Sequence, residues 1–526
     1  MSHLLLIPLL LPLTLAALVL ALPLSARMQK IIGLAGALGF LIAALGLLLQ
    51  SAQGDIAVTL LGDWPAPYGI VLLCDRLSAL MLTLTGLLAT AALLYATGGS
   101  DVSGRHFHAL FQFQLFGLAG AFLTGDLFNL FVFFEVLLMA SYGLLLQGGG
   151  AARTRAALHY ALLNLIGSLL FLLGAAMLYA ATGTLNMAHL AMRLQGLASA
   201  DASLASAGGL LLLTVFALKA ALLPLHAWMV PAYAAAAAPV AALFAILTKV
   251  GVYAMLRLLV LLSGIGPDQS IMPPVGLVLT GAAILTVAAG SLGVLASLRL
   301  RPMIAYLVMV SVGTLLAGIA PGSANGVSAA LYYLIHTTLI TAGLFLLADL
   351  IARGRPQGQR LIIGDPPRAA AILSPLFLLG AIAIAGLPPL SGFLGKTLIL
   401  SAVRDAAMAN GSPAWAWVWA AVLVSSLLVV LGLSRAGVLL LWRSRGATAT
   451  PGAAESAPAG DARRLGLAAS IALLAASPLL ILFAAPLTAF TLATATQVLD
   501  NRAYVDAIPG LEAMTLTPSA SAEGQR

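Results

Sequence analysis

Charged residues are scarce in this sequence. Aspartate, glutamate, lysine and arginine together make up 8% of the 526 residues, and hydrophobic residues make up 61%. In soluble domains roughly a quarter of the residues are charged. Together with a mean hydropathy of +1.07, this composition excludes an ordinary soluble domain and predicts a polytopic membrane protein embedded in the lipid bilayer.

Three further absences narrow the function. The single cysteine, Cys74, excludes an intrachain disulfide and any metal site built from several cysteines. No GxGxxG motif follows a strand pattern and opens a helix, and one cysteine cannot hold an iron–sulfur cluster. We therefore expect no metal and no redox cofactor in this chain. Strand-like alternation is also absent, which excludes a β-barrel.

Long apolar runs follow one another, divided by short loops that carry charge, glycine or proline. A helix needs about 20 apolar residues to cross a bilayer core about 30 Å thick. The sequence predicts an all-α fold of about fourteen transmembrane helices, near residues 4–24, 31–50, 75–97, 107–124, 127–147, 157–181, 208–224, 237–261, 273–296, 302–319, 326–350, 371–400, 414–442 and 466–496.

The basic residues predict the orientation of these helices. Sixteen lysines and arginines follow the odd-numbered helices, among them Arg27, Arg153 and Arg353, whereas the loops of the opposite side are poorer in them. By the positive-inside rule the first set is cytoplasmic, so both termini lie outside. The net charge of +8 results from this excess of basic residues in the cytoplasmic loops. We therefore expect no nucleic-acid partner.

The helices group into segments. Residues 1–106 contain helices 1 to 3, residues 107–261 a first set of five helices, and residues 273–442 a second set of five, followed by a cytoplasmic Ala/Gly/Pro-rich linker at 443–465, a peripheral helix at 466–496 and a polar tail at 497–526. The linker is expected to detach the last helix, so the functional body comprises helices 1 to 13.

Lysine is rare and unusually placed. Of the four lysines, Lys30 lies in a loop, whereas Lys219, Lys249 and Lys396 each lie inside an apolar span. Lysine loses its proton readily when it is removed from water, whereas arginine does not. Three lysines at this depth therefore indicate sites that carry and release protons.

Two other ionisable groups accompany these lysines. Glu135, in "NLFVFFEVLLMASY", is the one acid well inside a span, and His336, in "LYYLIHTTLITAGLF", is the deepest histidine. Unpaired groups at the bilayer midplane cost about 2.5 to 3.5 kcal/mol each and usually mark ion or proton pathways. Since all five groups fall near the midplane, we expect them to act as a relay.

Prolines interrupt two of the lysine-bearing helices. Pro224 follows Lys219 in helix 7, whereas Pro388 and Pro389 precede Lys396 in helix 12. Proline cannot donate to the carbonyl one turn earlier, and lipid tolerates such a break only where side chains or water satisfy that carbonyl. Lysines on opposite sides of two breaks predict two inverted five-helix repeats, helices 4 to 8 and 9 to 13.

Several quoted stretches together resemble a known family. "LKAALLPLHAWMVPAY", "ALFAILTKVGVYAMLR" and "GLPPLSGFLGK", with Glu135 after an aromatic run, are similar to the antiporter-like subunits of respiratory complex I and of the multisubunit Mrp (Mnh/Pha-type) monovalent cation/proton antiporters. The "LTKVGVY" wording and the lysine of helix 12 resemble the D-type branch of the Mrp subunits. One departure is "VPAYAAAAAPVAALF", which has alanines where relatives often have histidine, threonine or proline.

The resemblance implies a function and a site. It implies a subunit of a hetero-oligomeric antiporter, without enzymatic activity of its own, in the cell membrane of a prokaryote, which exchanges sodium or another monovalent cation for protons. In the resembling proteins the positions of Glu135 and Lys219 form a charge pair, Lys249 is the central lysine, His336 is a bridge and Lys396 is the terminal lysine.

Other interpretations stay open. A proton-pumping subunit of complex I or of a membrane-bound hydrogenase would explain the same residues, with the redox chemistry in partner subunits, whereas a passive scaffold would not explain the lysines. Any one lysine could instead pair structurally with an acid. Pro224, Pro388 and Pro389 are candidate gating residues; for His226 a gating role and a structural hydrogen bond are equal alternatives.

Overall fold

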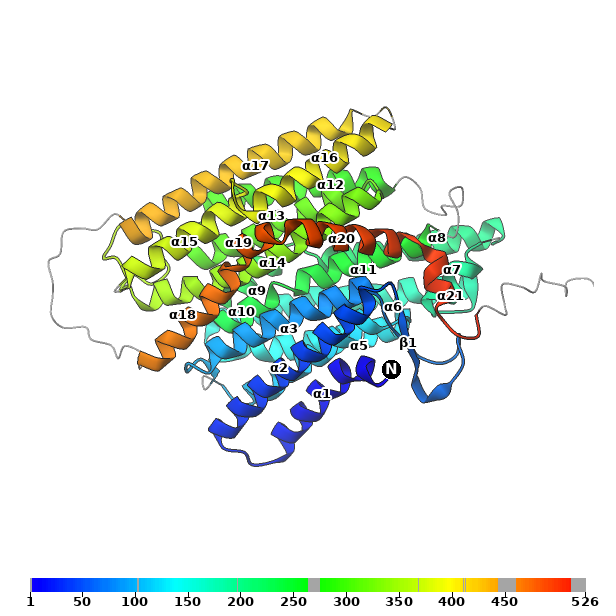
Figure 1. Cartoon of the computed structure of the whole chain (residues 1–526), viewed down its shortest axis with the longest axis horizontal. Coiled ribbons are helices and arrows are strands. Elements are labelled where there is room, and N and C mark those ends of the chain that lie inside the picture. The colour runs from blue at the N-terminus through cyan, green and yellow to red at the C-terminus, as the bar shows by residue number, and fades with distance from the viewer. Residues whose placement is uncertain are drawn as a thin grey trace, which may run out of the picture.

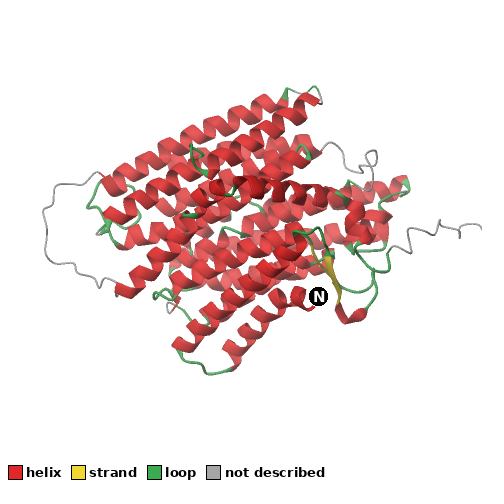
Figure 2. Ribbon diagram, in the orientation of Figure 1, coloured by secondary structure: helices red, strands yellow, loops and turns green. Residues whose placement is uncertain are grey.

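The computed structural model describes residues 2–101, 104–195, 197–263, 275–367, 369–409, 411, 413–442 and 460–511. Figure 1 shows a bundle of long helices, and Figure 2 shows the strands gathered in one hairpin at one end. In that hairpin β1 (Ala57–Leu60) pairs antiparallel with β2 (Val71–Cys74). Most of the predicted linker, residues 443–459, and the tail beyond residue 511 lie outside the described residues.

The first half of the chain contains eleven of the named α-helices. They are α1 (Ser2–Ala21), α2 (Ala26–Ser51), α3 (Arg76–Ala96), α4 (Phe107–Leu123), α5 (Leu127–Leu146), α6 (Ala151–Thr182), α7 (Met187–Arg193), α8 (Ser199–Lys219), α9 (Met229–Ala235), α10 (Ala238–Phe244) and α11 (Leu247–Leu262), with a 3-10 turn η1 (Leu61–Asp63) between the strands.

The named elements described in the second half are all helices. Its elements are α12 (Val275–Ala296), α13 (Leu300–Ile319), α14 (Ala324–Arg353), α15 (Ala370–Ala385), α16 (Ser391–Ala409), α17 (Ala414–Gly437) with a π-helical end η3 (Val438–Trp442), α18 (Gly460–Leu474), α19 (Ala476–Leu482), α20 (Ala484–Leu499) and α21 (Asn501–Asp506).

The length and composition of these helices are those of a multi-span membrane protein. Among the described residues, 12 helices are long and apolar enough to cross a bilayer, with Ala238–Leu262 taken as one, and α4, α15 and α20 are shorter apolar helices. The prediction of helical spans is therefore confirmed. The number fourteen, which also requires α4 and the interrupted α15–α16 as spans, stays a prediction, as does the repeat relationship.

Helix α14 forms the centre of the bundle. In its most apolar stretch 94% of the residues are buried within the chain, against 33% for the stretch that includes α17. Helices that are apolar on all sides lie either inside a protein or against lipid. The residue His336, in the middle of α14, is therefore enclosed by protein on all sides, whereas α1, α2, α6, α12 and α17 form the outer faces.

Three of the helices that carry ionisable groups of the expected relay are interrupted in the described part of the chain, one more than the sequence indicated. The predicted breaks of helices 7 and 12 are confirmed, between α8 and α9 and between α15 and α16. Helix 8, which the sequence predicts to be continuous, is also interrupted between α10 and α11. The amide of Lys249 there bonds to the carbonyl of Ile246, three residues back, at 2.9 Å. The tight turn thus places Lys249 at the start of α11.

The C-terminal helices are not peripheral. Helices α18, α19 and α20 follow one another closely and cross one face of the bundle (Figure 1). They pack against α14, and α18 and α20 also pack against α3, while α19 contacts α16. The prediction of a single detached helix at residues 466–496 is therefore wrong, because α18, α19 and α20 cover the central helix.

Two buried ion pairs stabilise opposite ends of α3. At its start, Arg257 donates to Asp75 at 2.6 Å. At its end, the hydroxyl of Tyr95 donates at 2.6 Å to Asp349, which also pairs with Arg301 at 2.6 Å. Buried carboxylates require such partners, since an unpaired charge in a protein interior is costly. These contacts attach α3 to α11 at one end and to α13 and α14 at the other.

The orientation of the bundle can be tested with single cysteines. The N-terminus and α21 lie at the same end of the bundle (Figure 1), and Cys74 is buried and should not react. Gln53 and Met28 are exposed at opposite ends of α2. If both termini are outside, a membrane-impermeant maleimide should label Gln53→Cys in intact cells and Met28→Cys only after permeabilisation. The reverse pattern would invert the predicted orientation.

Candidate functional site

Glu135 lies in the middle of α5 and is half-buried. Its carboxylate accepts a short hydrogen bond from the hydroxyl of Ser168 on α6. The same hydroxyl lies 3.0 Å from the carbonyl of Asn164. The predicted acid is therefore held against α6 by a neutral partner.

Lys219 is the last residue of α8 and directly precedes the break in helix 7. Its ammonium nitrogen is buried and has no hydrogen-bond partner among the described residues. It lies 5.5 Å from the centroid of the Phe134 ring, close enough for a cation–π contact. Its side chain also passes Gly167 on α6, where a Cβ atom would lie 4.0 Å from the Cε atom of Lys219.

The predicted charge pair is present as neighbours but not as a direct ion pair. Lys219 lies against Phe134 and Gly167. Phe134 directly precedes Glu135 in α5, and Gly167 directly precedes Ser168, the partner of Glu135, in α6. Lys219 and Glu135 are therefore neighbours. Glu135 attracts Lys219 electrostatically. Within the described part of the chain, however, the ion pairs closer than 4.0 Å do not include these two groups.

The break in helix 7 begins before its proline. Helix α8 ends at Lys219, and Ala221 adopts a left-handed conformation with φ of 59°. The carbonyl of Leu218 accepts a hydrogen bond of 2.9 Å from the indole of Trp228, and the amide of Leu223 donates to Thr286 on α12 at 3.1 Å. Side chains therefore satisfy backbone groups that the break frees.

The candidate gating residues lie within the breaks. Pro224 is exposed and His226 is half-buried in the turn between α8 and α9, and Pro388 and Pro389 are exposed between α15 and α16. The Nδ1 atom of His226 is buried without a hydrogen-bond partner among the described residues. A role of these four residues in gating stays a prediction.

Lys249 is completely buried at the start of α11. Its ammonium group donates to the hydroxyl of Ser311 on α13 at 3.0 Å, and its neighbour Thr248 lies at 3.4 Å. Both partners are neutral. The predicted central lysine thus joins the first half of the chain to the second through a hydroxyl group.

His336 lies at the centre of α14 and is completely buried. Its Nδ1 atom is 2.7 Å from the hydroxyl oxygen of Ser391, the first residue of α16. Its Nε2 atom has no partner among the described residues. The ring therefore has one nitrogen fixed by a hydroxyl and one nitrogen free to exchange a proton.

Lys396 lies in the second turn of α16 and is buried. Its ammonium group donates to the carbonyl of Ala385 at 2.8 Å and to the hydroxyl of Ser426 on α17 at 2.9 Å. Ala385 is the last residue of α15, and Gly386 follows with φ of 81°. The break in helix 12 therefore supplies a carbonyl oxygen to the lysine that follows it.

Four serines, which the sequence analysis missed, accompany the predicted groups. Each lies on a neighbouring helix and contacts one ionisable residue, in the pairs Ser168–Glu135, Ser311–Lys249, Ser391–His336 and Ser426–Lys396. Serines in apolar helices usually bond to a carbonyl of their own helix, so their sequence positions carry no signal. Only Ser391 lies in a stretch that the sequence had singled out, "GLPPLSGFLGK".

The ionisable groups are separated from one another. Among the described residues, none of the five is hydrogen-bonded to another of the five. Proton movement between them therefore needs water molecules or side-chain rotation. The arrangement is a row of separate sites on α5, α8, α11, α14 and α16.

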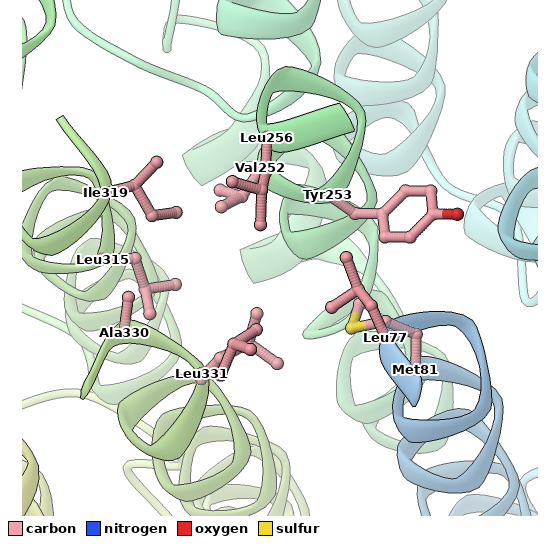
Figure 3. A pocket seen from close by; sticks show the side chains of 10 residues that line it. Leu77, Met81, Val252, Tyr253, Leu256, Leu315, Ile319, Ala330 and Leu331 are labelled. Carbon is pink, nitrogen blue, oxygen red and sulfur yellow. The ribbon is translucent and has the colours of Figure 1, made fainter. Parts of the chain in front are cut away.

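An apolar cavity is lined in part by the turn of α11 that follows Lys249. It is enclosed by α3, α11, α13 and α14, with Leu77, Val252, Leu315 and Leu331 among its lining residues (Figure 3). Tyr253 also lines it, but its hydroxyl donates to the carbonyl of Phe122 at 3.0 Å. Such a dry wall offers no ligand to an ion, so this cavity is not part of the candidate pathway.

An ion-translocating membrane bundle is indicated by the helix breaks, the buried lysines and the central histidine. The chain belongs to the transmembrane family described as NADH:quinone oxidoreductase/Mrp antiporter, which it matches over residues 124–429. It is 41% identical to a probable K⁺/H⁺ antiporter subunit, of the D type, from Rhizobium meliloti, over 84% of this chain and 88% of the relative. It is 32% identical to the D-type Na⁺/H⁺ antiporter subunit of Alkalihalophilus pseudofirmus, over 76% and 81%.

Solved structures share the fold over nearly the whole chain. A chain of the Mrp complex from Dietzia sp. superposes with a TM-score of 0.82 at 27% identity, over 97% of this chain and 100% of the other. A chain of respiratory complex I from Thermus thermophilus superposes with a TM-score of 0.74 at 27% identity, over 94% and 99%. The resemblance that the sequence motifs indicated is thereby confirmed.

The role of Trp228 at the break can be tested by removing its one hydrogen-bond donor. We expect Trp228→Phe to destabilise the protein by about 0.5 to 1.5 kcal/mol, because the buried carbonyl of Leu218 loses the indole donor and keeps only the backbone amide of Ala221 at 3.0 Å. The measurement is the thermal unfolding midpoint in detergent. Trp417, which is 72% exposed on α17, provides the control Trp417→Phe, and equal midpoints for the two variants would contradict the assignment.

Proposed function

We propose that this chain is an ion-translocating subunit of a multisubunit monovalent cation/proton antiporter, in which protons move along Glu135, Lys219, Lys249, His336 and Lys396. The observation that carries the proposal is the chemistry around the buried lysines. Their hydrogen-bond partners are hydroxyls and a carbonyl rather than carboxylates. A lysine kept only for structure would be paired with an acid.

Neutral partners suit a lysine that changes its charge. The hydroxyl of Ser311 accepts a hydrogen bond from a protonated Lys249, and it can turn to donate to the neutral amine. The hydroxyl of Ser426 can do the same for Lys396. A carboxylate would instead hold the proton on the lysine by its charge.

The first step is assigned to Glu135 and Lys219. Ser168 holds the carboxylate close to, but not on, the ammonium group. If Glu135 is drawn away by an ion or by a neighbouring subunit, Lys219 loses its compensating charge in a dry site and releases its proton toward Lys249. From there the proton passes through His336 to Lys396, with water bridging the gaps.

The surroundings of the chain are proposed on the same basis. Relatives named as antiporter subunits and a neighbour within an Mrp complex support a hetero-oligomeric assembly in a prokaryotic cell membrane. Relatives are named for both potassium and sodium; sodium is the cation of our proposal. The chain itself then acts as a secondary transporter rather than as an enzyme.

The relay can be tested in everted membrane vesicles that contain all co-expressed subunits. We expect Lys219→Ala and Glu135→Ala to abolish cation-dependent proton movement without loss of assembly, because each removes one member of the entry site. Lys219→Arg should also be inactive, since arginine keeps its proton. The measurement is the change in vesicle pH after a pulse of sodium or potassium.

Lys30 provides the matched control for these variants. It lies near the start of α2 rather than in the loop that the sequence predicts. There it is part-exposed and pairs with Asp101 at 3.3 Å, so Lys30→Ala should retain exchange. Full activity of Lys219→Ala or of Glu135→Ala would refute the relay. Activity of Lys219→Arg would mean that Lys219 supplies a fixed charge and releases no proton.

The alternative function is proton pumping in a complex I-like or hydrogenase-like oxidoreductase, which the complex I neighbour favours. The two functions differ in their energy source. Vesicles without an electron donor should show exchange on a cation pulse if the chain belongs to an antiporter. Proton movement that needs an electron donor and ignores the cation would instead establish the alternative.

A further inference from the structure

Ser477 of α19 contacts the site of His336 from the C-terminal part of the chain. It is completely buried, and its hydroxyl oxygen lies 2.8 Å from that of Ser391. It also accepts a hydrogen bond of 3.4 Å from the backbone amide of Ser391, the first residue of α16. Since the first amides of a helix have no partner within it, Ser477 completes the start of α16 from outside.

The contact is unusual for a serine in this part of the chain. Ser470, also completely buried and one helix earlier, donates to the carbonyl of Gly466 in its own helix at 2.9 Å. Such a bond to the preceding turn is the ordinary arrangement. Ser477 is the one polar residue of "ASPLLIL" in α19, and it bonds to another helix instead.

The two serines and the histidine form a chain of hydrogen bonds. Ser391 lies 2.7 Å from Nδ1 of His336 on one side and 2.8 Å from Ser477 on the other. A hydroxyl group rotates to donate in either direction. When His336 is neutral, Ser477 donates to Ser391, and Ser391 donates to Nδ1. When His336 is charged, Nδ1 donates to Ser391, and Ser391 donates to Ser477.

The other ring nitrogen is directed toward α16. A Cβ atom at Gly392 would lie 2.8 Å from Nε2 of His336 and still closer to the carbonyl oxygen of Ala383, so glycine at this position lets both groups approach α16. Lys396 lies four residues later on the same face of α16. With Nδ1 occupied by Ser391, proton exchange is directed to Nε2.

Few other ionisable groups surround His336. Lys396 on α16 is the charged group that acts on it, and Tyr333 of α14 has its ring centroid 5.8 Å away. Helices α10, α15 and α19 carry no titratable residue. The polar groups that act on the ring are therefore the hydroxyl chain, Lys396 and the backbone carbonyl of Ala383 on α15.

We propose that Ser477 is a positioning residue of the proton relay: through Ser391 it fixes the ring of His336, supplies a hydrogen-bond partner in both protonation states and thereby directs proton exchange to Nε2. The inference rests on the proposed function. It gives the C-terminal helices, which the sequence placed outside the functional body, a direct part in transport.

The test is the pH profile of cation/proton exchange in vesicles that contain the full complex. Ser477→Ala removes a partner of Ser391 in both protonation states, but the Ser391 hydroxyl is left without an acceptor only when His336 is charged. The alkaline limb should therefore shift to lower pH by about half to one unit, as expected for loss of one ordinary hydrogen bond. Ser477→Thr keeps the hydroxyl and should restore the wild-type limb. Ser470→Ala is the matched control and should leave the profile unchanged.

A double-mutant cycle keeps the inference testable if Ser477→Ala also impairs folding. Ser391→Ala removes the link itself, so its shift should not increase when Ser477→Ala is added. A wild-type profile for Ser477→Ala, a profile equal to that of Ser470→Ala, or additive shifts in the double variant would overturn the assignment. Loss of exchange in Lys219→Ala together with a silent Ser477→Ala would refute this inference alone, whereas exchange in Lys219→Ala would refute the relay.

Discussion

A protonated amine inside an apolar bundle needs oxygen atoms around it, and the helices near each buried lysine are arranged to supply them. Lys249 obtains hydroxyl oxygens from α11 and α13, and Lys396 obtains a carbonyl from α15 and a hydroxyl from α17. Lys219 has only an aromatic face and the more distant charge of Glu135. The three ammonium groups thus differ in the number of oxygen partners they have among the described residues: two each for Lys249 and Lys396, and none for Lys219.

The interruptions of the helices are part of the same arrangement. In a continuous helix each interior carbonyl already accepts the amide four residues later, so a carbonyl without that bond is a stronger partner for a side chain. The break after Ala385 releases one carbonyl for Lys396, whereas at the break after Lys219 the carbonyl of Leu218 is taken by the indole of Trp228 and the amide of Ala221. The same kind of break therefore stabilises the charged form of one lysine and leaves the other without an oxygen partner.

Composition and the prolines predicted much of this architecture, but not the contacts within it. Proline indicated which helices break, yet α8 ends at Lys219 because the chain turns at Ala221, where no sequence rule expects a left-handed residue. The turn at Ile246 contains neither glycine nor proline. The partners Ser311 and Ser426 depend on how neighbouring helices are rotated, which the packing of the whole bundle decides.

The position of the C-terminal helices follows from the burial of α14. A helix that carries His336 at its centre must be shielded on every side, because a gap would expose the ring to lipid or to uncontrolled water. The elements from α1 to α17 leave one face of α14 open, and α18, α19 and α20 cover it. A segment in that place lies beside His336, and Ser477 of α19 reaches the histidine through the hydroxyl of Ser391.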